Sequence, residues 1–317
     1  MKRCIVLFVI LTTLLWGCTV PPEPVETPTE AVTLPVTDHT EATSLSTEPE
    51  PAPPETEAAE PTEPAISQRS PDDSDFVRIL EFLPSARQAL AYATEDNFTG
   101  QPIYEFSDAW LRYGTVKKLM VVSRELEEKG LYLLIWDGFR PVSAQFTLWE
   151  VCPDPTYVAN PETGHSSHSR GNTVDLTLVD INGMPLEMPT SFDDFSPLAD
   201  RDYSDCTETA RENALLLQET MEKHGFSGYF GEWWHYSDTD SYPVEESFTP
   251  ISPVTLYADC NEFITLRTAP DTAAEALTHI PKDDQFQALA EYGDFFYVDY
   301  QGLLGYVLQS YSAPTVN

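Results

Sequence analysis

Two histidines and an aspartate in the middle of the chain have the types and the setting of metal ligands. His168 lies in the polar run SSHSRG, and Asp175 follows seven residues later inside the apolar run VDLTL. A carboxylate within an apolar strand is unfavourable unless it is paired or binds a metal. His235 lies further along, in GEWWHY. Two imidazoles, one carboxylate and a free fourth position match catalytic Zn²⁺. By type and spacing, these three residues are therefore candidates for a site that holds one zinc ion per chain.

A glutamate close to the third of these residues has the chemistry of a general base. Glu232 precedes His235 by three residues, and such a carboxylate can take a proton from a metal-bound water. In a flat strand, positions i and i+3 face opposite sides, so the two side chains share a site only where the strand bends, bulges or ends. Gly231 allows such an irregularity. From spacing alone, a core histidine paired with a buried aspartate is the competing interpretation.

Several motifs occur in a fixed order along the middle of the chain. They are NFTG, DGFRP, the segment Ser166-x-His168-Ser-Arg170-Gly171 with VDLTL after it, FDDF and EWWHY. Together they resemble the D-alanyl-D-alanine dipeptidase family, over about residues 85 to 240. The resemblance implies an α+β domain with the hedgehog/DD-peptidase-like fold and a zinc ion held by His168, Asp175 and His235.

The resemblance also implies a role for individual side chains. Glu232 would be the general base, passing the water's proton to the leaving amine. Arg140 would stabilise the oxyanion with its fork of donors, although a salt bridge that fixes the strand end is the alternative for this residue. Ser166 would help to hold the substrate, and Asp193 or its neighbour Asp194 would meet the substrate ammonium.

The implied activity is hydrolysis of D-Ala-D-Ala, or of related D-amino-acid dipeptides, in cell-wall peptide metabolism. Two alternatives stay open at this point. One is a D,D-carboxypeptidase that acts on peptidoglycan stem peptides. The other is a non-catalytic cell-wall-binding lipoprotein whose peptidase domain serves as a scaffold.

The elements that position these residues follow from apolar spacing and turn signals. The pattern predicts helices and strands in loose alternation, with one hairpin around Asn182-Gly183, and hence an α+β domain. We expect helices over 110–130, 143–151 and 208–226, strands over 131–139 and 229–237, and two strands within 172–188.

The composition changes again after about Ser252, where short β-rich runs alternate with polar turns. LRTAPD, FFYV and GYV in this order resemble a bacterial SH3-like domain, which implies a small all-β barrel over 251–317. Its aromatic residues would either form the barrel core or stack on a cell-wall glycan or peptide, giving a possible peptidoglycan contact. These residues are Tyr292, Phe295, Tyr297, Tyr300 and Tyr306.

The N-terminal residues predict the compartment. A short basic start precedes an apolar run over 4–16, too short for a comfortable transmembrane helix. Leu15-Trp16-Gly17-Cys18 then resembles a lipoprotein cleavage box, although an uncleaved anchor is the alternative. We predict a signal peptide over 1–18, a lipid on Cys18, a Pro/Glu/Thr-rich disordered stalk over 19–71 and a peptidase domain over 72–250. The protein would then be extracytoplasmic and anchored to the membrane.

Net charge bears on the possible partners of the protein, and cysteine content bears on its possible disulfides. The formal net charge of −35 excludes nucleic acid as a partner, because phosphate binding needs basic patches. An exported protein permits a disulfide between Cys152 and Cys206, and unpaired buried thiols are the equal alternative.

Overall fold

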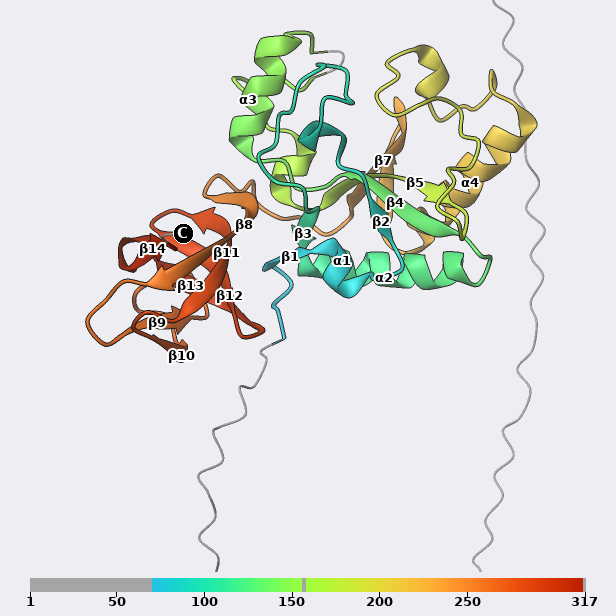
Figure 1. The fold of residues 1–317 in the computed structure, drawn as a ribbon. Helices are drawn as coiled ribbons and strands as arrows, with labels where there is room; N and C mark the ends of the chain where they lie inside the picture. The colour runs from blue at the N-terminus through green and yellow to red at the C-terminus, as the bar shows by residue number, and fades with distance from the viewer. Residues whose placement is uncertain (1–69, 156–157, 316–317) are drawn as a thin grey trace, which may run out of the picture. The chain divides into compact units, whose positions relative to one another are not determined.

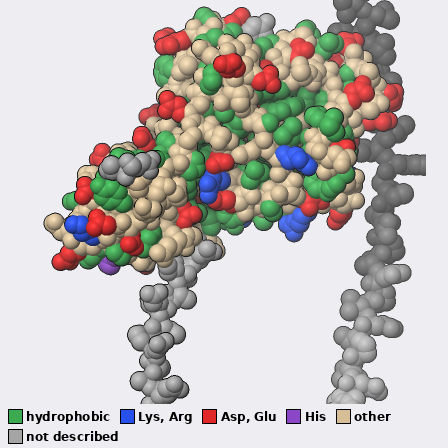
Figure 2. All heavy atoms as spheres, viewed as in Figure 1, with side chains coloured by type: hydrophobic (Ala, Val, Ile, Leu, Met, Phe, Trp, Pro, Cys, Tyr) green, Lys and Arg blue, Asp and Glu red, His purple; other side chains and the backbone are tan. Residues whose placement is uncertain are grey.

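The computed structural model describes residues 70–155 and 158–315. The predicted signal peptide, the lipid site Cys18 and the stalk up to residue 69 lie outside the described residues, so these features and the membrane location stay predictions. Within the described ranges, no helix is long and apolar enough to cross a bilayer. On the face shown in Figure 2, acidic side chains are scattered widely and basic ones are few.

A five-stranded mixed sheet forms the centre of the first folded region (Figure 1). Its strand order is β2-β4-β5-β7-β6, with β2 parallel to β4 and the other neighbours antiparallel. The central strand β5 is buried along its whole length, as its continuous apolar run requires. The bounds are β2 (Arg87–Gln88), β4 (Tyr132–Asp137), β5 (Thr173–Val179), β6 (Phe226–Tyr229) and β7 (Glu232–Asp238).

Two long helices pack on this sheet and on each other. Helix α2 contacts β4, α4 contacts β5, β6 and β7, and the two helices touch, so they cover one face together. The Thr207 hydroxyl caps α4 by accepting a hydrogen bond from Ala210 N at 3.1 Å, and Gly225 with φ of 88° follows its end. The helices are α1 (Ile79–Phe82), α2 (Tyr113–Glu127), α3 (Val142–Val151), α4 (Glu208–Lys223) and the 3₁₀ turns η1 (Ala91–Ala93), η2 (Ser167–Arg170) and η3 (Pro197–Ala199).

Two expected elements differ from the structure. The helix predicted over 110–130 begins only at Tyr113, because β3 (Trp110–Arg112) pairs antiparallel with β1 (Phe76–Arg78). The turn at Asn182-Gly183 forms, but the second strand predicted after it is reduced to a single bridge between Val179 and Pro185. One further backbone hydrogen bond, from Leu186 N to the Leu178 carbonyl at 3.0 Å, follows this bridge. Proline has no N–H to donate to a strand ladder, which helps to keep this pairing short.

The C-terminal region is an antiparallel seven-stranded sheet with the order β10-β9-β13-β12-β11-β8-β14. Tyr300 is buried in the core of this sheet, whereas Phe295, Tyr297 and Tyr306 are buried in an aromatic core shared with the peptidase domain, and Tyr292 packs partly buried against that shared core. They therefore form no exposed stacking surface, and peptidoglycan contact stays a prediction. The strands are β8 (Phe248–Ala258), β9 (Phe263–Arg267), β10 (Ala276–Pro281), β11 (Gln285–Tyr292), β12 (Phe295–Tyr300), β13 (Leu303–Leu308) and β14 (Ser312–Pro314), with the 3₁₀ turn η4 (Gln309–Tyr311) before β14. The α+β region followed by a small all-β unit confirms the predicted fold class.

The two regions share one aromatic cluster at the start of β8. Phe248 is 1 % exposed, and its ring lies 4.3 Å from Phe76, 5.4 Å from Trp110 and 5.7 Å from Phe139 by centroid distance. The cysteines of the described part, at 152, 206 and 260, are free thiols, so the unpaired alternative holds for Cys152 and Cys206.

A glycine after η2 is expected to be far less replaceable than a matched glycine elsewhere. Gly171 has φ of 73°, and a Cβ there would lie 2.4 Å from Phe76 Cε1. Gly130 has φ of 72°, but a Cβ there would meet no atom of the described chain within 4 Å. The Gly130→Ala variant therefore measures only the cost of placing a side chain on a left-handed backbone. We expect Gly130→Ala to lower the free energy of unfolding by about 1–2 kcal/mol and Gly171→Ala by about 1–3 kcal/mol more. Urea unfolding of the chelator-treated protein measures both values, and equal losses would contradict the packing argument.

Candidate metal centre

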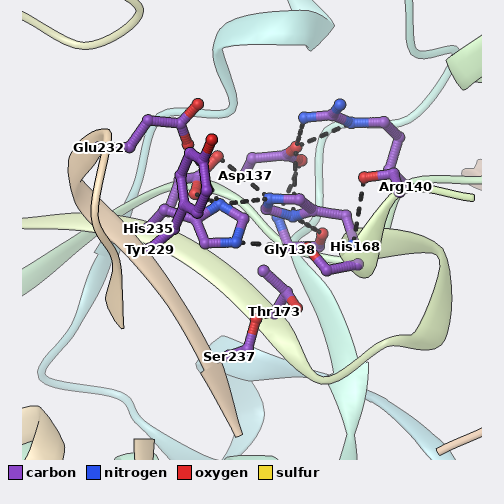
Figure 3. Close-up of polar contacts among 12 residues, drawn as sticks. Asp137, Gly138, Arg140, His168, Thr173, Tyr229, Glu232, His235 and Ser237 are labelled. Atoms are coloured by element: carbon purple, nitrogen blue, oxygen red, sulfur yellow. Dashed lines mark hydrogen bonds and ion pairs between the residues drawn. The ribbon is translucent and has the colours of Figure 1, made fainter. Parts of the chain in front are cut away.

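Three separate elements bring the predicted metal ligands together. His168 lies on η2, Asp175 on β5 and His235 on β7, and the β5–β7 ladder places Asp175 directly opposite His235. One ligand atom from each residue lies within 4.8 Å of the other two. Figure 3 shows the two imidazole rings next to each other, and their planes meet at 78° with the ring centroids 5.0 Å apart. The structure thus gathers all three predicted ligands at one point.

The distances among the three side chains fit a shared cation. His168 Nε2 lies 3.3 Å from Asp175 Oδ2, and His235 Nδ1 lies 3.1 Å from Asp175 Oδ1. The two ring nitrogens, His168 Nε2 and His235 Nδ1, are 3.4 Å apart. Asp175 Oδ1 is buried and makes no hydrogen bond of proper geometry within the described part of the chain. A donor set of two imidazoles and a carboxylate, with an unsatisfied buried oxygen, fits Zn²⁺.

Neighbouring groups orient the two imidazoles. The Nδ1 atom of His168 lies 2.8 Å from the Gly138 carbonyl, a bond that requires the proton on Nδ1 and leaves Nε2 free as a ligand. The Ser166 hydroxyl accepts a hydrogen bond from His168 N at 3.3 Å and so caps η2. On the other ring, His235 Nε2 lies 3.3 Å from the Ser167 hydroxyl. Each ring therefore turns one fixed nitrogen toward Asp175.

The Glu232 carboxylate does reach the site, because the β6–β7 ladder slips. Gly228 pairs with Tyr236, yet the next residue, Tyr229, pairs with Glu232. This irregularity turns Glu232 to the same side as His235, with Oε2 and Nδ1 3.3 Å apart. The irregularity that the spacing required is therefore present, in the strand that follows Gly231.

Arg140 both lines the pocket and forms the predicted alternative, a salt bridge at the strand end. Its Nε and one terminal nitrogen donate to Asp137 Oδ2 at 3.2 and 2.7 Å, and the other terminal nitrogen donates to Gln145 Oε1 at 2.9 Å. The Tyr104 hydroxyl donates to the second oxygen of Asp137 at 2.7 Å. The guanidinium, drawn beside Asp137 in Figure 3, is thus held rigidly, and it has further N–H groups available to a ligand in the cavity that it lines.

A cavity of about 260 Å³ opens above the three ligands and contains Asp193. Its carboxylate accepts a hydrogen bond from the Tyr92 hydroxyl at 3.0 Å. Burial, together with the charge of Asp175, raises the pKa of Asp193 to about 7. Asp194 does not line this cavity, so the structure favours Asp193 among the two predicted candidates.

The pKa values of Asp175 and Glu232 are shifted in opposite directions by their surroundings. Burial disfavours the charged form of Asp175, but the His168 and His235 rings outweigh it and hold the pKa of Asp175 well below its usual range. Burial raises the pKa of Glu232, the His235 ring opposes that shift, and the charge of Asp175 adds to it. The two carboxylates therefore have different proton affinities, as different roles require.

Some residues of the site do not emerge from the sequence. From the sequence, Asp137 is assigned no role. Yet Asp137 ends the apolar run of β4, and a carboxylate in an apolar strand is the signal that identified Asp175. Tyr229 lines the cavity, and its ring lies 5.9 Å from His235. His165 is exposed at the cavity and is not part of the three-residue ligand group of the described chain.

Removing one ligand should remove the metal. We expect the purified full-length chain to retain one zinc ion after dialysis, and His168→Ala or His235→Ala to retain almost none, since three protein ligands are the usual minimum of a catalytic zinc site. His224→Ala is the matched control, because that ring pairs with Glu125 at a helix end away from the site. Elemental analysis measures the zinc content of each variant. One zinc ion per chain in His235→Ala would refute the assignment of His235 as a ligand.

The metal centre lies within a region that matches a known protein family. The family model described as D-ala-D-ala dipeptidase matches residues 72–252, and that of the bacterial SH3 domain matches 262–313. The D-alanyl-D-alanine dipeptidase of Escherichia coli K12 is 36 % identical over 175 residues, which are 55 % of this chain and 90 % of that protein. The one of Enterococcus faecalis is 33 % identical over 196 residues, 54 % of this chain and 95 % of that protein.

A solved structure with some likeness is a vancomycin-resistance D,D-pentapeptidase in complex with Zn(II). It is 17 % identical with a TM-score of 0.29, over 42 % of this chain and 74 % of that one. The family match covers more than half of the chain and contains every predicted ligand. The chain belongs to the D-alanyl-D-alanine dipeptidase family, with a bacterial SH3 domain after the peptidase domain.

Proposed function

We propose that this protein is a zinc metallopeptidase that hydrolyses D-Ala-D-Ala or a closely related D-amino-acid dipeptide. The observation that carries the proposal is the placement of Glu232 beside the His-Asp-His group, inside the domain that matches the dipeptidase family. Relatives from Escherichia coli, Enterococcus faecalis and Streptomyces coelicolor are described as D-alanyl-D-alanine dipeptidases. A general base next to a site of this composition supports peptide hydrolysis by an activated water.

The protein's own groups have distinct tasks in such a reaction. His168, Asp175 and His235 would hold the zinc ion, which would supply Lewis-acid activation of a water molecule and of the scissile carbonyl. Glu232 accepts the proton of the attacking water and returns it to the leaving amine. Burial raises the pKa of Glu232 above the usual value of a glutamate, which makes the carboxylate a better proton acceptor.

Three further side chains bind or stabilise the substrate in this proposal. Arg140, fixed by Asp137, directs N–H groups to the oxygen that becomes negative in the transition state. Asp193, at the cavity wall, binds the substrate ammonium in its charged form. Ser166 lines the cavity while it caps η2, and its hydroxyl contributes a polar contact to the substrate.

The size of the cavity favours a small substrate, but one observation supports a second candidate. A volume of about 260 Å³ lies at the lower end for ligand pockets and suits a dipeptide. A larger cavity of about 980 Å³ shares Phe98 and Asp193 with the first. A longer peptide could extend into that space, so D,D-carboxypeptidase action on stem peptides is the second candidate.

Glu232→Gln should separate binding from turnover. We expect full zinc content and a kcat for D-Ala-D-Ala that is lower by about 10²–10⁴-fold, because the amide keeps the shape of the carboxyl but cannot accept the proton. Release of D-alanine is measured with the full-length chain, on the dipeptide and on a D-Ala-D-Ala-ended pentapeptide side by side.

The paired substrates decide between the two candidates. Cleavage of the dipeptide alone supports the dipeptidase, and cleavage of the pentapeptide supports the carboxypeptidase. A zinc-loaded protein that cleaves neither substrate would count against both and would favour the scaffold alternative.

Arg140 and Asp193 should affect different kinetic constants. Arg140→Lys replaces a bidentate fork by a point charge, and we expect mainly kcat to fall, by about 10²-fold or more. Asp193→Asn removes the charge that meets the ammonium, and we expect mainly KM to rise, by about 10-fold, for the loss of one charge-assisted hydrogen bond. Initial-rate kinetics over a range of dipeptide concentrations separate the two effects. A lower kcat with unchanged KM in Asp193→Asn would show that this carboxylate does not bind the ammonium.

A further inference from the structure

One guanidinium occupies the gap that the slipped β6–β7 ladder creates. Arg201 lies between η3 and α4, far in sequence from the hairpin. Its Nε donates to the Tyr229 carbonyl at 2.8 Å, and one terminal nitrogen donates to the carbonyls of Trp233 at 3.0 Å and His235 at 2.9 Å. The Arg201 backbone N–H also donates to the Phe230 carbonyl at 2.9 Å. A single residue therefore ties both strands of the hairpin together at the slip.

The slip explains why such a cation is needed. Because Gly228 pairs with Tyr236 and Tyr229 pairs with Glu232, the three residues from 233 to 235 have no partner strand residue in β6. Backbone carbonyls in a partly buried strand need a donor, and the missing strand cannot supply one. Arginine has several donors in a rigid planar fork, so it can satisfy carbonyls of both strands at once.

The space around Arg201 matches a guanidinium in shape. A Cβ on Gly228 would lie 2.3 Å from the Arg201 Cζ atom, so only glycine leaves room for the group. The Tyr236 ring lies below it, with Cζ 4.4 Å from the ring centroid, and the Tyr236 hydroxyl is 3.2 Å from the second terminal nitrogen. The cation–π contact, a neighbouring glycine and carbonyls on two sides together define a socket for arginine rather than lysine.

We propose that Arg201 is a positioning residue for the hydrolytic site. It holds the β6–β7 slip, and the slip is what places the Glu232 carboxylate 3.3 Å from His235. Arg201 does not line the substrate cavity, so it acts through the backbone of His235, the third metal ligand, and of Tyr229, the strand partner of Glu232. Without it, the strand can relax toward regular pairing, in which positions i and i+3 diverge to opposite faces.

The kinetic part of this inference rests on the proposed function, and the metal-binding part does not. The main variant is Arg201→Lys, which keeps the positive charge but lacks the fork. Gly228→Ala is the second variant, because its methyl group displaces the guanidinium while leaving Arg201 in the chain. Arg211→Ala is the matched control, since Arg211 forms an exposed ion pair with Glu208 on α4.

We expect Arg201→Lys and Gly228→Ala to weaken zinc binding about 10–100-fold in a chelator competition, and to lower kcat on D-Ala-D-Ala by a similar factor, as groups that orient metal ligands typically do. KM should change little, because Arg201 does not touch the cavity. In Arg201→Ala, millimolar methylguanidinium should restore part of the lost zinc affinity and kcat by occupying the socket. It should restore nothing in Glu232→Gln.

The outcomes separate a positioning role from mere stabilisation. Wild-type zinc affinity and kcat in folded Arg201→Lys would overturn the proposal. A second result would also overturn it. The assay temperature is lowered until circular dichroism shows that each variant is as fully folded as the wild type. If zinc affinity and kcat of Arg201→Lys and Gly228→Ala then return to wild-type values, Arg201 only stabilises the fold. If the wild-type protein cleaves no dipeptide but both variants still lose zinc affinity, Arg201 keeps its role and only the proposed function fails.

Discussion

A negative charge inside the most deeply buried strand is the constraint on which the rest of the site depends. Asp175 is 3 % exposed in the middle of β5, where an isolated carboxylate would be strongly unfavourable. Its neighbour across the ladder with β4 is Asp137, a second carboxylate of like charge. Two cationic or proton-donating groups must therefore surround each of them.

The pocket is the arrangement that meets this demand. Asp175 faces His168 and His235, the groups that bind a metal, whereas Asp137 faces Arg140 and the Tyr104 hydroxyl. His168 also lies near Asp137, with Nδ1 3.6 Å from Oδ2, so this ring joins the two sets of groups. The groups around Asp137 and those around Asp175 lie side by side because β4 and β5 are neighbouring strands. The positions of the two sets therefore cannot vary independently.

The three metal ligands, the position of Glu232 beside them and the fold class could be predicted because each has a local signal in the chain. Asp175 interrupts an apolar run, His235 and Glu232 share one short motif, and Gly231 indicated the irregularity that the site needs. The extent of the slip could not be predicted, because it depends on Arg201, about thirty residues earlier along the sequence. Likewise, Trp110–Arg112 has helical apolar spacing, yet it forms β3 since β1 supplies a partner from outside the window. Long-range pairing overrides local periodicity in both cases.

Phe248 has a bearing on how this protein was assembled from its parts. The ring belongs to an aromatic cluster with Phe76 and Phe139 of the peptidase domain, while the strand that it begins, β8, runs on into the barrel. The join is therefore a shared strand rather than a spacer. Genetic exchange of the barrel for another module would have to preserve this aromatic residue and its strand direction, so recombination at this junction is more restricted than at a flexible linker.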